Sequence, residues 1–136
     1  MSIQHPVIAV TGSSGAGTTT VMSSFANIFR REGINAQMIE GDAFHRYDRL
    51  EMRAKMKEAA AQGNPHFSHF GPEANLFAEL ESLFREYGQR GAGRFRKYLH
   101  DDAEAAPYNQ PPGTFTAWEP VPPATGNAAC SSRFSE

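Results

Sequence analysis

The chain has 136 residues, close to the length of one average domain, which excludes a multidomain enzyme and a large barrel. Apolar residues make up 40% and charged residues 21%, a composition that supports a packed core. The net charge of −2 argues against a nucleic-acid partner, and no run approaches the roughly 18 apolar residues that cross a bilayer. The first residues lack a secretory pattern, and the single cysteine, Cys130, excludes an internal disulfide. These features predict a cytoplasmic protein with no nucleic-acid and no membrane partner.

The first 40 residues have the pattern of a βαβ unit. The apolar run Val7–Val10 ends at a glycine cluster, as a buried parallel strand does. Residues 18–32 follow helical spacing and stop before Gly33, and residues 34–39 alternate as a second strand. This order predicts an α/β fold with a parallel sheet and flanking helices.

Two further helices are expected beyond this unit. Residues 48–61 favour a helix that Gly63 and Pro65 break, and residues 73–87 form an amphipathic helix that Gly88 would end. Residues 94–100 alternate basic and aromatic side chains, which is compatible with a strand. Beyond residue 101 no periodicity remains, and acidic residues and prolines dominate.

One motif carries chemistry directly. The segment fits the phosphate-binding loop G-x-x-x-x-G-K-[ST] at every defined position but one, between a strand and a helix. Its residues are Gly12, Ser13, Ser14, Gly15, Ala16, Gly17, Thr18, Thr19 and Thr20. The motif predicts a nucleoside triphosphate site, without separating a kinase from a GTPase or ATPase, in which backbone N–H groups and the helix N-terminus bind phosphates and the Thr19 hydroxyl binds Mg²⁺. Thr18 stands where the motif has lysine, so another cation must supply that charge. The alternative is an ordinary glycine-rich turn.

Asp42 follows the second expected strand, as the glycine loop follows the first. Ligands of parallel sheets bind outside the carboxyl ends of the strands. If the two strands are neighbours, Asp42 lies near the phosphates and can accept a proton from an attacking hydroxyl. A turn or helix-capping role explains Asp42 equally well.

Several side chains near Asp42 in the sequence suit an anionic substrate. His45, Arg46 and Arg49 follow within two helical turns, and arginine matches phosphate geometry. A solvated helix start is the alternative for these three. Tyr98 and His100 end the third expected strand and are candidates for the rim of the site. His66 and His69 are interpreted as loop or packing residues; the sequence offers no metal-binding cluster.

Five separated motifs, in order, resemble the bacterial type of phosphoribulokinase over about residues 5–124. They are the segments 10–20, 39–46, 67–75, 84–88 and 98–105. The resemblance implies ATP- and Mg²⁺-dependent phosphorylation of ribulose 5-phosphate, a step of carbon dioxide fixation in the Calvin cycle of photosynthesis. It implies that Asp42 is the base and that His45 and Arg49 bind the sugar phosphate. It also implies a homo-oligomer for the full-length protein, and bacterial members resemble this chain in having threonine at the lysine position.

The last residues depart from this family. The family is about twice as long and enters an apolar strand with a second carboxylate, whereas residues 126–136 show no strand pattern. We therefore expect an incomplete P-loop domain over residues 1–124 and a divergent, disordered tail over 125–136, from a partial sequence, an early stop or a frame change. A uridine kinase-like enzyme and an inactive chain that at most binds nucleotide are the alternatives. A regulatory GTPase is disfavoured because no Asn-Lys-x-Asp motif is present.

Overall fold

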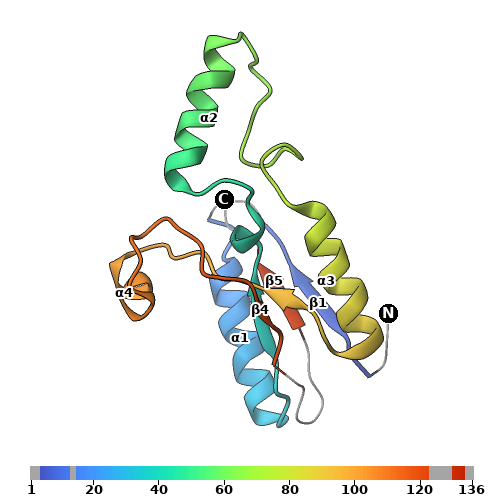
Figure 1. The fold of residues 1–136 in the computed structure, drawn as a ribbon. Helices are drawn as coiled ribbons and strands as arrows, with labels where there is room; N and C mark the ends of the chain where they lie inside the picture. Colours follow the sequence, from blue (N-terminus) through green and yellow to red (C-terminus); the bar gives the residue numbers. More distant parts are fainter. Residues whose placement is uncertain (1–3, 13–14, 123–129, 134–136) are drawn as a thin grey trace.

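The computed structural model describes residues 4–12, 15–122 and 130–133, the last of these as main chain alone. The elements follow in chain order as β1 (Val7–Val10), α1 (Thr18–Arg31), β2 (Gln37–Glu40), the 3₁₀ helix η1 (Gly41–Phe44), α2 (Arg49–Ala61), α3 (Phe77–Arg90), β3 (Arg94–Phe95), α4 (Asp102–Ala105), the 3₁₀ helix η2 (Ala106–Tyr108), β4 (Glu119–Pro120) and β5 (Cys130–Arg133). Figure 1 shows α1 and α3 alongside a small sheet, with α2 beyond one end of it. Within the described residues, no helix has the length and apolar character that a membrane crossing needs.

The main sheet has three parallel strands in the order β1-β5-β2. Val10 and Glu40 both lie opposite Arg133, so β1 and β2 end at the same level. The predicted α/β class with a parallel sheet is confirmed, and β1, α1 and β2 form the predicted βαβ unit. Because the strands share one direction, their carboxyl ends meet at one edge of the sheet, where ligands of such sheets bind.

The central strand comes from a segment in which the sequence predicted none. Residues Cys130–Arg133 lack apolar alternation, yet they pair in parallel with both β1 and β2. Main-chain N–H and C=O groups of the two flanking strands need partners, and almost any segment without proline can supply them. The expectation of a tail without a strand is therefore wrong at these residues. The predicted boundary between residues 124 and 125 lies outside the described residues.

Helices α1 and α2 agree closely with the sequence. α1 ends one residue earlier than predicted, and Gly33 adopts the expected left-handed conformation with φ of 65°. Asp48 is the N-cap of α2, and its carboxylate accepts hydrogen bonds from the amides of Leu50 and Glu51. The Glu51 side chain in turn accepts from the amide of Asp48, which completes a capping box.

Helix α3 is displaced along the chain relative to the prediction. It begins at Phe77 instead of residue 73, because Asn75 is tied into the preceding turn by hydrogen bonds to the carbonyls of His69 and Gly71. Its C-cap is Gly91, with φ of 64°, and not Gly88, which lies within the helix. The glycine that adopts the left-handed conformation ends the helix.

The third strand is shorter than the alternating pattern of residues 94–100 predicted. β3 covers only Arg94–Phe95 and pairs antiparallel with β4. The ladder is interrupted where the amide of Lys97 donates to the Thr116 side chain, and it resumes as a single bridge between Tyr98 and Phe115. This arrangement carries Tyr98 and His100 away from a regular strand and toward the carboxyl edge of the main sheet.

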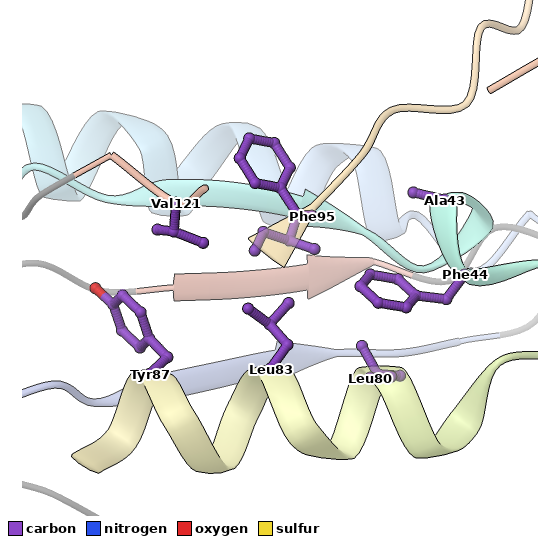
Figure 2. Packing of buried hydrophobic residues seen from close by; sticks show 8 residues of the cluster. Ala43, Phe44, Leu80, Leu83, Tyr87, Phe95 and Val121 are labelled. Carbon is purple, nitrogen blue, oxygen red and sulfur yellow. The ribbon is translucent and has the colours of Figure 1, made fainter. Parts of the chain in front are cut away.

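The core lies between the sheet and α3. Figure 2 shows Leu80, Leu83 and Tyr87 of α3 directed at the sheet, with Phe44 of η1 at one end of the same cluster. All four are buried, and burying one such side chain stabilises a fold by about 1.5–3 kcal/mol. Because Phe44 belongs to this cluster, the core fixes the turn that carries Asp42.

Candidate active site

Two glycines of the loop adopt the left-handed backbone conformation. Gly15 and Gly17 both adopt φ of 78°, a conformation that is strained for any other residue. A Cβ on Gly12 would lie 3.0 Å from Cγ2 of Thr18, so the loop is also closely packed at its start. Ser13 and Ser14 lie outside the described residues.

The N-terminus of α1 suits an anion. Gly17 is its N-cap, and no side chain of the described residues accepts a hydrogen bond from this end of the helix. No acidic residue lies in the first turn. The first amide groups and the positive end of the helix dipole are therefore directed at the loop without a competing carboxylate.

The phosphate loop implies a Mg²⁺ ion, and the residues around the loop show what could hold it. Thr18, Thr19 and Thr20 form the first turn of α1, at the end where phosphates would bind. Within the described part of the chain, no group of three or more His, Cys, Asp or Glu side chains could hold a metal ion. One hydroxyl, from Thr19, fits a Mg²⁺ ion whose other ligands are phosphate oxygens and water, as is usual for this ion.

Asp42 lies at the same edge of the sheet, two residues beyond the end of β2. The condition that β1 and β2 be neighbours is not met, because β5 lies between them. Adjacent strands lie about 4.8 Å apart, so the ends of β1 and β2 are separated by about 10 Å. β5 fills the sheet between these two ends, so the loop and Asp42 share one edge of the sheet without being on adjacent strands.

The carboxylate of Asp42 faces two histidines. Its Oδ1 lies 3.4 Å from Nε2 of His45, and its Oδ2 lies 3.1 Å from Nε2 of His100. The Asp42 residue is only 7% exposed. The N-cap of η1 is Glu40 and that of α2 is Asp48, so Asp42 caps neither helix, but it does lie in the first turn of η1, as the turn alternative predicted.

A cleft of about 350 Å³ brings the predicted substrate residues together. It is lined by Asp42, His45, Tyr47, Asp48, Arg49, Met52, Arg53, Met56, His69, Tyr98 and His100. Tyr47, Arg53 and His69 were not predicted to belong to the site; His69 was interpreted as a loop or packing residue. A larger cavity of about 470 Å³ shares only Tyr98 with this cleft and contains none of its histidines.

Arg49 connects the segments around the cleft. Its guanidinium donates to the main-chain carbonyl of His100 at 2.8 Å and lies 5.9 Å from the centre of the Tyr98 ring. Guanidinium has five N–H donors, so further ones remain for a phosphate. Arg46, by contrast, does not line the cleft: its side chain donates to the carbonyls of Glu73 and Asn75.

Arg96 holds the turn that carries Asp42 and His45. Its Nε donates to the carbonyl of Ala43 at 2.8 Å, and its Nη2 donates to the carbonyl of His45 at 2.7 Å. The guanidinium lies 3.7 Å from the ring centre of Phe115 and 4.7 Å from that of Trp118. Burial lowers the pKa of Arg96, but the side chain remains a cation at neutral pH.

His100 also contacts Glu104. Burial lowers the pKa of His100, but its hydrogen bonds with Asp42 and Glu104 outweigh burial and raise this pKa above the ordinary value. The hydrogen bond from the His100 amide, followed by that from its ring, lowers the pKa of Glu104. The site thus favours an imidazolium between two carboxylates.

The parallel sheet carries at its carboxyl edge a glycine loop and a helix N-terminus that no side chain of the described residues caps, which places the chain among the P-loop nucleotide-binding domains. A model of the Phosphoribulokinase / Uridine kinase family matches residues 7–125. The chain belongs to this family.

Individual relatives agree with this assignment. The chain is 62% identical over 125 residues to the chromosomal phosphoribulokinase of Cupriavidus necator. This match covers 92% of this chain and 43% of the relative. The chain is 58% identical over 118 residues to phosphoribulokinase 1 of Cereibacter sphaeroides, covering 87% and 41%. The solved structure of phosphoribulokinase from Rhodobacter spheroides matches with a TM-score of 0.79 and 41% identity, over 96% of this chain and 43% of that one. The chain thus spans less than half the length of these relatives.

Proposed function

We propose that this chain contributes the nucleotide loop and the base to ATP-dependent phosphorylation of D-ribulose 5-phosphate, giving D-ribulose 1,5-bisphosphate. The observation that carries the proposal is the cleft in which Asp42 meets four predicted substrate residues, at the sheet edge that also carries the phosphate loop. The relatives named phosphoribulokinase support this acceptor over the uridine of the alternative. The reaction would serve carbon dioxide fixation in the Calvin cycle of photosynthesis.

The loop residues 12–20 would bind the phosphates of ATP through main-chain N–H groups. A Mg²⁺ ion held by Thr19 and by phosphate oxygens would neutralise charge on the transferred group. Asp42 would accept the proton of the sugar hydroxyl as that oxygen attacks the γ-phosphate in line. The two histidines beside its carboxylate would orient Asp42 for this step.

The remaining cleft residues would hold the sugar phosphate. Arg49 and His45 provide donors for the 5-phosphate, and Tyr98 and His100 form the opposite wall. Arg53 adds a second guanidinium to the same cleft. Two arginines and three histidines around a small cleft favour a dianionic sugar phosphate over an uncharged nucleoside.

The proposal includes a cytoplasmic location and a homo-oligomer for the full-length protein. Neither nucleic acid nor a membrane is proposed as a partner, since the chain has near-balanced charge.

The test is made in a longer protein, because the relatives are more than twice as long as the match. Residues 1–122 of this chain would replace the matching part of the Cupriavidus necator relative, which is 62% identical over the matched segment. We expect Asp42→Asn in this chimera to abolish turnover while ATP binding persists. Asp48→Asn is the matched control, since Asp48 lines the same cleft but caps α2, and asparagine caps equally well. Near-normal turnover of Asp42→Asn would refute the assigned base.

A second candidate is that the 136-residue chain alone is no enzyme and at most binds nucleotide. Val21 and Ile28 on α1 are 41% and 49% exposed, so an apolar part of this helix is uncovered. A cooperative melt that Mg-ATP shifts upward would show a folded nucleotide-binding chain, whereas a broad transition without ligand response would show that the chain alone binds no nucleotide.

A further inference from the structure

Glu104 makes two hydrogen bonds to a single residue of the cleft. Its Oε2 accepts from the main-chain amide of His100 at 2.8 Å and contacts Nδ1 of the same imidazole at 2.9 Å. The opposite ring nitrogen, Nε2, lies 3.1 Å from Oδ2 of Asp42. The Glu104 carboxylate on α4 is therefore linked to the Asp42 carboxylate on η1 through the His100 imidazole.

The two ends of this chain of contacts differ in exposure. The Glu104 side chain is 49% exposed, that of His100 is 32% exposed, and that of Asp42 is 10% exposed. Glu104 does not line the cleft of about 350 Å³. Any effect of Glu104 on the cleft must consequently pass through His100.

Both Glu104 and His100 are held in place by other groups. The amide of Glu104 donates to the side chain of Asp101, which is the N-cap of α4. The carbonyl of His100 accepts from Arg49, and the His100 ring meets the Tyr98 ring edge-on with centres 4.9 Å apart. These contacts restrict the movement of the imidazole ring. What can still change is which of its nitrogens carries a hydrogen.

A carboxylate can only accept hydrogen bonds, and both ring nitrogens of His100 face one, so an imidazolium donates to Glu104 and to Asp42 at once. A neutral imidazole keeps one hydrogen, and the shorter contact, 2.9 Å to the Glu104 oxygen that the His100 amide also holds, against 3.1 Å to Asp42, favours Nδ1. Carboxylates that fix the tautomer of a functional histidine in this way recur where the ring orientation matters.

We propose that Glu104 is a positioning residue, which fixes a proton on Nδ1 of His100 and so directs Nε2 of that ring at the carboxylate of Asp42. The assignment of the hydrogen to Nδ1 of His100 is argued from the hydrogen bonds and distances observed in this chain. Its consequence for turnover rests on the proposed function, in which Asp42 is the base.

Charged and titratable groups from every neighbouring segment act on this ring. They are Asp42 of η1, Glu40 of β2, Arg49 of α2, Glu104 of α4 and the adjacent Tyr98. Three of the five are acidic, and together with its hydrogen bonds they keep the pKa of His100 above its ordinary value despite burial. The arrangement extends the pH range in which His100 is an imidazolium, and above that range it favours the Nδ1–H tautomer.

The test is nitrogen NMR of the ring on the 136-residue chain labelled with ¹⁵N-histidine, with His100 assigned from its loss in His100→Gln. In the wild type above the His100 titration, we expect the hydrogen on Nδ1 in the major form. In Glu104→Gln we expect that form to become a minor one and the His100 titration to move to lower pH. Asp102→Asn, which removes the same charge from the same helix without a contact to His100, should leave both observations unchanged.

A wild-type ring with the hydrogen mainly on Nε2 would overturn the proposal, as would a Glu104→Gln spectrum identical to the wild type. If Glu104→Gln does not fold, Glu104→Asp keeps the charge and withdraws the oxygen, and it should reduce the Nδ1–H form to an intermediate share. An unchanged share in that variant would likewise refute the role. These readouts need no turnover, so retained activity of the Asp42→Asn chimera would refute the proposed function and leave the positioning role standing.

Discussion

The sharpest stability prediction concerns Arg96, which joins β3 to the turn carrying Asp42 and His45. Arg96→Met removes two hydrogen bonds from a charged donor, to the carbonyls of Ala43 and His45. Hydrogen bonds of this kind contribute about 1.5–3 kcal/mol each, and this half-exposed site favours the lower end. Contact with the two aromatic rings adds about 0.5–1 kcal/mol, of which methionine retains the packing part.

We therefore expect Arg96→Met to lower the free energy of unfolding by about 3 kcal/mol in urea titrations of the chain. Arg96→Lys keeps the charge but not the two-pronged geometry, so it should lose about half as much. The control is Arg94→Met, an exposed arginine two residues away, with an expected change within about 0.5 kcal/mol. If Arg96→Met were as stable as Arg94→Met, the assignment of Arg96 as the anchor of the Asp42 turn would be wrong.

Four further changes test other parts of the structure. Asp48→Ala removes the capping box of α2 and should cost about 1 kcal/mol in urea unfolding; no loss would contradict the cap. Phe44→Ala empties a site that is 1% exposed and should cost about 3–5 kcal/mol, whereas a loss under about 1 kcal/mol would argue against the observed core. Gly17→Ala forces a side chain into φ of 78° and should abolish the upward shift of the melt by Mg-ATP; an undiminished shift would place the nucleotide elsewhere. The pKa of His100 is raised above its ordinary value of 6.5, so protonated His100 stabilises the fold fully below pH 6.5 and loses this effect as the pH rises further. The pKa of Glu104 is lowered below its ordinary value of 4.5, so ionised Glu104 stabilises the fold fully above pH 4.5. Both contributions are therefore complete between about pH 4.5 and 6.5. The stability difference between wild type and Glu104→Gln should therefore shrink as pH rises from 6 to 9, and a constant difference would exclude this coupling.

Local signals made the first half of the fold predictable. The apolar run of β1, the glycine loop and the helical spacing of α1 each depend on neighbouring residues, and the structure places them within a residue of the prediction. Helix ends were less predictable where two glycines competed, because only the conformation of Gly91, and not its identity, distinguishes it from Gly88. The start of α3 depended on hydrogen bonds of Asn75 to a loop that precedes it.

The site was predictable in part for the same reason. His45 and Arg49 lie close to Asp42 in the sequence, so their proximity followed from local spacing. Arg96 and His100 reach the turn that carries Asp42 over separations of 50 residues or more, through the path of a chain that leaves β3 after two residues. The insertion of β5 between β1 and β2 rests on main-chain pairing, which leaves no pattern of side chains in the sequence.

The most direct test of the proposed function is the choice of acceptor. A coupled assay of ADP release would compare ribulose 5-phosphate with uridine, each with Mg-ATP, in the chimera that carries residues 1–122 of this chain. We expect release with ribulose 5-phosphate and none above background with uridine, because the two arginines and three histidines of the cleft favour an anionic sugar. Release with uridine and none with ribulose 5-phosphate would contradict the proposed function, while the fold and the phosphate loop would stand.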